Sequence, residues 1–152
     1  KKNIIEKYFN SEGSTVSYTD DSFLYVSIPL KDKTYQKVGI HHKKNDNNYT
    51  VYAVSGIIFY FDDFEKCLDK QSLIAYDISD LLVNFKKKEY KFENHETPDD
   101  REVTSIMFTN KNNETIQIDC TDWGKNTIYT DNLRIDIMSE EFINWLNTKA
   151  YN

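Results

Sequence analysis

Two carboxylates and a lysine near the middle of the chain have residue types that could do metal-dependent chemistry. Asp80 precedes Glu89-Tyr90-Lys91, an arrangement that resembles the Asp…Glu-x-Lys set of metal-dependent nucleases, in which the carboxylates hold Mg²⁺ and the lysine meets the scissile phosphate. Charged residues make up 29% of this chain, so such a set arises easily by chance, and Lys86 to Lys88 beside it indicate a solvated surface. We therefore interpret the set as structural and keep a Mg²⁺-dependent nuclease as the alternative function.

The three histidines do not form a recognisable metal set. His41 and His42 are adjacent on a predicted strand, so their rings point to opposite faces, and His95 falls in a predicted loop. We interpret all three as surface or edge residues, with a His42 general base left open. No Gly-x-Ser-x-Gly elbow or glycine-rich phosphate loop occurs, and the chain has four glycines in all. The sequence predicts no catalytic residue, metal or cofactor.

Paired aspartates and one tryptophan are the best candidates for contacts with a partner. Helix capping or turn formation explains most of the aspartates, but an acidic patch facing a basic partner is the alternative. Trp123 stands out because Asp122-Trp123-Gly124 is a predicted turn, where the core explains a tryptophan less easily. The candidate partner-binding residues are Asp62, Asp63, Asp99, Asp100, Asp119, Asp122, Trp123 and Tyr129.

The two cysteines, Cys67 and Cys120, lie in unrelated contexts without CxxC spacing. We interpret both as free, buried thiols, with one disulfide between them as the alternative. Free thiols favour a reducing compartment, so we expect the protein in the cytoplasm. No leader-like apolar segment opens the sequence, and a leader removed earlier is the other reading.

Length and charge limit the classes of partner. The chain has 152 residues, which fits one domain over residues 1–152, and its formal charge is -6. An acidic chain disfavours nucleic acid as the main partner and favours a basic protein. The longest apolar run, from Gly56 to Phe61, is far shorter than the ~20 residues that cross a bilayer. The oligomeric state is left open.

Periodicity predicts helices at both ends of the chain and a short one between them. Ile4, Ile5, Tyr8 and Phe9 follow helical spacing before Gly13. A capping pattern begins a short helix at about residues 63–69, and Ser139 precedes a last helix that buries Phe142, Ile143 and Leu146, with Trp145 at its edge.

Between the helices, alternating apolar residues predict antiparallel strands. The clearest is a hairpin of residues 103–109 and 115–120, in which Ile106 and Phe108 meet Ile116 and Ile118. Leu133 to Met138 forms another strand, and Gly56 predicts a bulge. Residues 73–85 are interpreted as a strand followed by a short helix or turn, and the polar stretches 86–88 and 93–102 as a loop. The fold class is α+β, mainly an antiparallel twisted sheet of six to eight strands.

Eleven tyrosines add a second feature of the composition. Strand propensity explains most of them, yet tyrosine and aspartate together are also typical of a protein-binding face. In size, acidity, aromatic content, paired aspartates and absence of catalytic sets, the chain resembles the small immunity proteins that bacteria make against contact-dependent or polymorphic toxins. That resemblance implies an antitoxin, not an enzyme, which neutralises a basic toxin by covering its active site. The ectodomain of a secreted or lipid-anchored bacterial protein is the remaining alternative.

Overall fold

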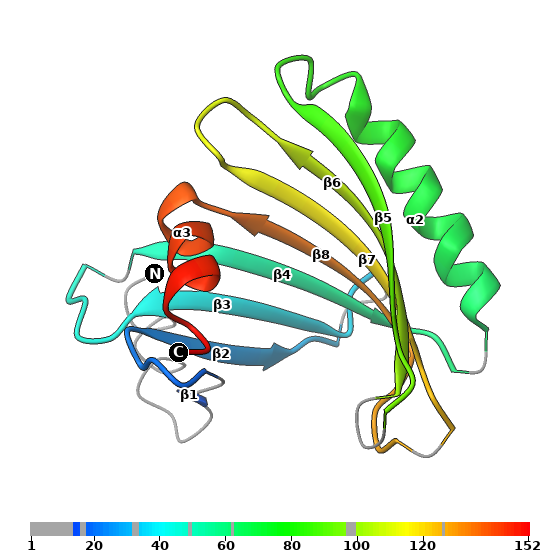
Figure 1. Cartoon of the computed structure of the whole chain (residues 1–152), viewed down its shortest axis with the longest axis horizontal. Helices are drawn as coiled ribbons and strands as arrows, with labels where there is room; N and C mark the ends of the chain where they lie inside the picture. The colour runs from blue at the N-terminus through cyan, green and yellow to red at the C-terminus, as the bar shows by residue number, and fades with distance from the viewer. Residues whose placement is uncertain are drawn as a thin grey trace.

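The computed structural model describes residues 14–15, 18–31, 34–48, 50–61, 63–96, 100–125 and 127–152. Two four-stranded antiparallel meanders make one sheet with the strand order β1-β2-β3-β4-β8-β7-β6-β5. The meanders join through the antiparallel β4–β8 pair at the centre (Figure 1). The strands are β1 (Ser14–Thr15), β2 (Phe23–Pro29), β3 (Lys37–Lys43), β4 (Val51–Phe59), β5 (Lys86–Asn94), β6 (Arg101–Thr109), β7 (Thr115–Trp123) and β8 (Asn132–Met138); the helices are α2 (Phe64–Ser79) and α3 (Glu140–Thr148).

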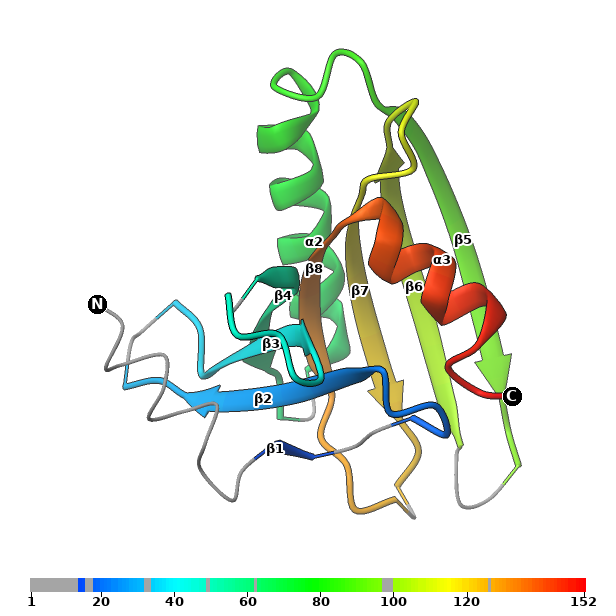
Figure 2. The same cartoon turned by 90° about the vertical axis from the view of Figure 1, so that its left-hand side faces the viewer.

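The two helices lie on opposite faces of the curved sheet. Helix α2 contacts β6, β7 and β8, whereas α3 contacts β4 (Figure 2). Side chains alternate between the two faces along each strand. We call the face under α2 the outer face and the face under α3 the inner face. Each helix thus follows one meander in sequence but covers the other.

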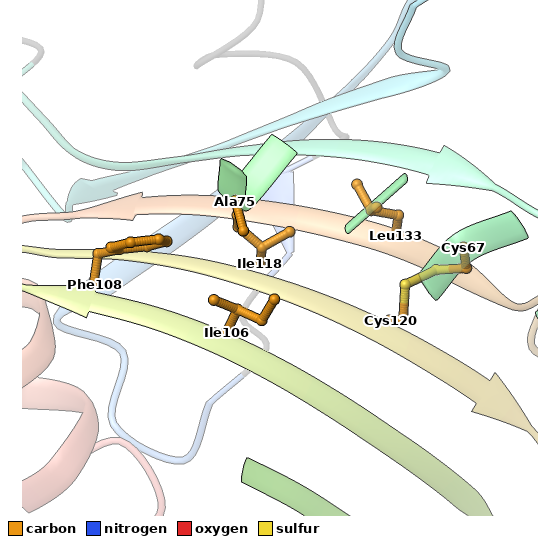
Figure 3. Packing of buried hydrophobic residues seen from close by; sticks show 7 residues of the cluster. All are labelled: Cys67, Ala75, Ile106, Phe108, Ile118, Cys120 and Leu133. Carbon is orange, nitrogen blue, oxygen red and sulfur yellow. A yellow bond between two sulfur atoms is a disulfide. The ribbon is translucent and has the colours of Figure 1, made fainter. Parts of the chain in front are cut away.

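The outer face of the second meander carries an apolar core beneath α2. Ile106 pairs with Ile118 and Phe108 with Ile116, as the hairpin prediction requires. Ala75 of α2 packs on Ile118, and Ile106, Phe108, Ile118 and Ala75 are at most 7% exposed (Figure 3). The predicted antiparallel α+β fold is therefore confirmed for the described residues.

A disulfide joins Cys67 of α2 to Cys120 of β7 in this core (Figure 3). The expectation of two free thiols was wrong. The two cysteines lie 53 residues apart, and only the packing of α2 across β7 brings them together. One helical turn later, the buried Gln71 donates from Nε2 to the carbonyl oxygens of Thr104 and Ile118, at 2.7 and 2.6 Å. Covalent and polar contacts thus fix the helix to two strands.

The inner face of the first meander is closed by an aromatic core. Phe23 of β2 packs against Phe142 and Trp145 of α3 at ring-centroid distances of 5.3 and 4.8 Å. His41 is buried in this cluster, and its ring lies 4.5 Å from that of Phe142. The predicted strand from Leu133 to Met138 and the α3 cap are confirmed, since Ser139 Oγ accepts from the Phe142 amide.

Several sequence predictions need correction. Helix α2 does not end near Asp69 but continues to Ser79, because Gln71, Ala75 and Ile78 face the sheet at helical spacing. Residues 86–94 form edge strand β5 instead of a loop. The strand irregularity lies between His41 and His42, and the pairing of β4 runs through Gly56 without a break. The predicted N-terminal helix lies outside the described residues.

Candidate binding site on the inner face

The predicted partner-binding residues gather at one end of the sheet, which we call the loop end. Here β4 and β7 finish, and α2, β6 and β8 begin. Asp63 caps α2 by accepting from the Lys66 amide, and Asp100, Asp122, Trp123 and Tyr129 lie in loops and strand ends at the same end of the sheet. Sequence reasoning had no means to predict this convergence, because it depends on strand order. Asp62 and Asp99 lie outside the described residues.

Trp123 is the centre of an aromatic and cationic stack at the loop end. Its ring lies 4.4 Å from that of Tyr129, and the Arg101 guanidinium stands 5.3 Å from the Trp123 ring centroid. The same guanidinium is 5.7 Å from the Phe92 ring on the edge strand. The Trp123 amide donates to Asp131 Oδ1 at 2.8 Å, which fixes the start of the loop. Trp123 is only partly buried and lines a small hollow of about 220 Å³.

The acidic residues of the loop end repel one another. Asp122 and Glu102 are cross-strand partners on the outer face. Burial raises the pKa of Asp122, and the charges of Asp131, Glu102 and Asp100 raise it further. Like charges held this close are unfavourable unless something offsets them. Asp100 and Asp122 are the predicted acidic residues that belong to this cluster, and their contact with a partner stays a prediction.

Asp119 lies apart from the other candidates, on the inner face of β7. It belongs to a larger hollow of about 720 Å³, which lies beside α3 and extends to the loop end at Trp123. A volume of that size is typical of small-molecule sites, which are ~300–1,000 Å³. Residues of six strands line it, among them Tyr25, Lys37, Phe59, Asp119, Trp123 and Arg134.

A single row of side chains crosses the floor of this inner hollow. Strand pairing places Lys37 opposite Ile57, Ile57 opposite Arg134, and Arg134 opposite Asp119. The row continues through Ser105 of β6 to Tyr90 of edge strand β5. Neighbouring strands are ~4.8 Å apart, so these groups stand side by side. The row places two cations and one carboxylate in sequence across the sheet.

The Asp119 carboxylate is largely buried and held by hydrogen bonds. It accepts from the Ser105 hydroxyl and from Gln117 Nε2, at 2.9 Å to Oδ2 for the latter. Burial raises the pKa of Asp119 to about 6, and the charge of Asp136 raises it as well. Asp119 therefore titrates near neutral pH, which is a frequent property of functional carboxylates.

Arg134 is fixed by a second polar network next to Asp119. Its Nε donates to Asp136 Oδ1 at 2.9 Å, and Nη2 donates to Ser55 Oγ at 3.1 Å. Ser55 in turn donates to Asp136, which is 7% exposed. The pKa of Arg134 is raised chiefly by the charge of Asp136 against the opposing effect of burial. Half-exposed but held at its base, the guanidinium faces the hollow in one orientation.

Sequence reasoning missed Lys37, Arg134 and Asp136. In Leu133-Arg134-Ile135-Asp136-Ile137 the charged residues alternate with apolar ones, as on any strand with a solvated face. Charges on a central strand are unusual, and β8 is one of the two central strands, so its charged residues become a signal once the strand order is known. Strand order, however, is visible only in the fold.

The nuclease-like set does not assemble into a site. Glu89 pairs with Lys87 at 2.6 Å on the outer face of edge strand β5. On the same face, Lys91 pairs with Glu93 of β5 and with Glu102 of the neighbouring strand β6. Asp80 is the C-cap of α2. Among the described residues, no group of three or more histidines, cysteines or carboxylates is arranged to hold a metal ion.

Two of the three histidines are not surface residues, contrary to the expectation from sequence, whereas His95 is exposed as expected. His41 and His42 are 2% and 6% exposed. Burial lowers the pKa of His41 to about 3, and the nearby charge of Arg134 lowers it further. The His41 ring is 3.2 Å from the Tyr18 hydroxyl, so it packs as a neutral core residue.

A second hollow, on the outer face, is apolar. It has a volume of about 400 Å³ and is lined by Val54, Phe85, Ile116 and Ile137, among others. The only ionisable carboxylate on its wall is Glu114. It has no converging polar groups, so the inner hollow is the stronger candidate for specific recognition.

Comparisons with protein-family models, with curated proteins and with solved structures found no match to this chain. In the part of the chain that the structure describes, no helix is long and apolar enough to cross a membrane.

Proposed function

We propose that this chain is a binding protein that holds a small polar ligand in the inner hollow. The observation that supports this most strongly is the row of ionisable groups on its floor. Asp119 and Asp136 are withdrawn from water, and Arg134 is half-buried between them. Burying charged groups costs stability unless they are well paired, so sites that keep them usually serve recognition or chemistry.

The placement of α3 supports the same proposal. The helix closes the inner face over β2 to β4, and only its C-terminal extension, at Tyr151, reaches the edge of the hollow. Over β6, β7 and β8 the covering helix lies on the outer face instead. The inner face of the second meander therefore keeps a concave, polar surface open to solvent.

Calorimetric screening of small polar molecules tests the proposed site. We expect hits whose binding is lost in Thr121→Trp, because Thr121 lines the hollow and a larger side chain fills it. The matched control is Ser72→Trp, on the exposed side of α2, which should bind as the unaltered chain does. Thermal melting must show that both variants fold. Hits that survive Thr121→Trp, or no hits, would contradict the proposal.

We also propose that the protein works in an oxidising compartment, outside the cytoplasm. The Cys67–Cys120 disulfide supports this, since such bonds persist mainly in secreted and periplasmic proteins. The expectation of a cytoplasmic protein rested on free thiols, so its basis is lost. Alkylation of the protein isolated from its own host, followed by mass spectrometry, should find neither cysteine labelled. Full labelling of both cysteines would argue for the cytoplasm.

An immunity protein remains the second candidate function, because the predicted acidic residues converge at the loop end. Asp100, Asp122, Trp123 and Tyr129 would then meet a basic toxin, with charge steering the encounter and the aromatic rings packing at its centre. Native mass spectrometry from the host should find a stoichiometric basic partner that Asp122→Asn releases and Thr121→Trp retains. Absence of any basic partner would remove this candidate.

A further inference from the structure

We infer that the ligand of the inner hollow is a zwitterion that carries a carboxylate and an ammonium group on one carbon, as a free α-amino acid does. This inference rests on the proposed binding function and names the chemical class of its ligand. It follows from the order of charges along the row Lys37–Ile57–Arg134–Asp119.

The positive end of the row fits a carboxylate. Lys37 and Arg134 are two strands apart, or roughly 10 Å at the spacing of a sheet, with the apolar Ile57 between them. The Lys37 ammonium lies over the Phe59 ring, and the Arg134 guanidinium is turned to Asp136 and Ser55. A carboxylate above Ile57 therefore lies between the strand positions of the two cations. The described hydrogen bonds of Arg134 use Nε and Nη2, and a guanidinium has five N–H donors. The contacts of Nε with Asp136 and of Nη2 with Ser55 fix the orientation of the guanidinium, and with it the direction of the other N–H donors.

The negative end of the row fits an ammonium group. Asp119 is the direct cross-strand partner of Arg134, so the backbone positions of these two oppositely charged residues are one strand spacing apart. Ser105 and Gln117 donate to the Asp119 carboxylate from one side and orient it. A ligand cation beside this desolvated carboxylate favours its charged form. One ligand with adjacent opposite charges therefore matches both groups at once.

The lining of the hollow carries charges of both signs. Lys37, Arg101 and Arg134 are cations, and Asp119 is a carboxylate. A pure anion leaves the partly dry Asp119 without a ligand cation, and a pure cation makes no use of the positive end. A dipolar ligand meets both kinds of group.

Aromatic rings surround the row and fit an apolar side chain of the ligand. The Lys37 ammonium nitrogen lies over the Phe59 ring, 5.4 Å from its centroid, and Trp123 lies at the loop end of the same hollow. On the other side, the Tyr25 ring lies over Gly39, where any Cβ would approach it to within 2.5 Å. Gly39 thus allows Tyr25 to lie flat against the sheet and form one wall. We therefore choose an aromatic amino acid as the probe.

Calorimetric titration with L-phenylalanine and two analogues tests the inference. 3-Phenylpropanoate lacks the ammonium group, and phenethylamine lacks the carboxylate. We expect L-phenylalanine to bind at least roughly tenfold more tightly than either analogue, since each lost charged contact is a substantial part of the affinity. Equal binding of an analogue and L-phenylalanine would overturn the inference.

Two variants assign each group of the ligand to its end of the row. Asp119→Asn should weaken L-phenylalanine and phenethylamine while leaving 3-phenylpropanoate bound as well or better. Lys37→Met should weaken L-phenylalanine and 3-phenylpropanoate but not phenethylamine. Lys111→Met, in the exposed β6–β7 turn, is the matched control and should change nothing. The opposite assignment, or equal effects on all three molecules, contradicts the model of one oriented zwitterion.

The outcomes separate this inference from the proposed function. If L-phenylalanine and other α-amino acids fail to bind, while neutral or anionic molecules bind and Thr121→Trp abolishes them, the zwitterion is wrong and the binding hollow stands. If no small molecule binds the hollow, both the inference and the proposed function are wrong.

Discussion

The two meanders of the sheet have similar topology but opposite faces covered. In the first, α3 closes the inner face with Phe23, Phe142 and Trp145. In the second, α2 closes the outer face with Ile118, Leu133 and the disulfide, and the inner face stays open. In each meander, the face that a helix covers becomes core. In the second meander, the opposite face keeps polar groups that are available for recognition.

The two halves also differ in the direction in which burial shifts the pKa of an ionisable group. His41 in the first half is kept neutral by burial, with a pKa lowered to about 3. Asp119 in the second half has a pKa raised to about 6. Acid should therefore destabilise the first half, whereas a rise in pH should destabilise the second.

Removal of the disulfide should lower the free energy of unfolding more than any other change, and it should loosen α2 more than α3. A bridge between residues 53 apart contributes about 4 kcal/mol by the chain-entropy model. We expect the Cys67→Ala/Cys120→Ala double variant to lose about that much free energy of unfolding in urea titrations, with hydrogen exchange rising in α2 more than in α3. Dithiothreitol should destabilise the original chain and leave the double variant unchanged. An unchanged urea midpoint would contradict the tethering of α2.

Asp119→Asn should stabilise the protein, by up to about 3 kcal/mol at pH 7. The folded pKa of Asp119 lies above its unfolded value, so the folded state binds the extra proton and stability falls as pH rises from about 4 to 6. The variant removes this loss because asparagine is neutral and its carbonyl can still accept from Ser105. Below about pH 4 the two proteins should be equally stable in urea titrations. A destabilised variant at pH 7 would show that Asp119 is structural.

His41 should make the protein sensitive to acid. Its folded pKa lies below the unfolded value, so the unfolded state binds the proton and stability falls as pH drops below 6.5. Between pH 6.5 and pH 5 this amounts to about 2 kcal/mol. His41→Gln should have a smaller slope of unfolding free energy against pH in that window. An identical slope in the two proteins would remove His41 as the cause.

Glu89→Ala should have the smallest effect. The Glu89–Lys87 pair lies exposed on edge strand β5, and exposed pairs typically contribute about 0–1 kcal/mol. We expect no measurable change in the thermal melting temperature. The same variant tests the nuclease alternative, because Mg²⁺-dependent cleavage of single- or double-stranded DNA that disappears in Glu89→Ala would refute the structural interpretation of this set.

Local sequence signals predicted the parts of the fold that local interactions determine. The 103–120 hairpin and the Ser139 cap of α3 both depend on residues close in sequence. The second half of α2 was mistaken for a strand because Ile74, Tyr76 and Ile78 alternate, although Tyr76 is 77% exposed on a helix. β5 was mistaken for a loop because most of its residues are charged, and only Tyr90 and Phe92 on one face are apolar.

The candidate site shows the same limit. Trp123 and the loop-end aspartates were predicted from composition, and their grouping depends on the β4, β7 and β8 ends meeting. Arg134 and Lys37 gained their meaning only from the strand order that aligns them with Asp119. The disulfide was missed for an equivalent reason, since its two cysteines meet only when α2 crosses β7.

Amide shift mapping with the molecules that bind in the calorimetric screen tests the central contrast between the two halves most directly. The account predicts perturbed amides on the inner face of β7 and β8, around Asp119 and Arg134, and unchanged amides beneath α3 at Phe23 and Ala53. Perturbations centred on the apolar outer hollow at Val54 and Ile137, with Asp119 and Arg134 unaffected, would contradict it.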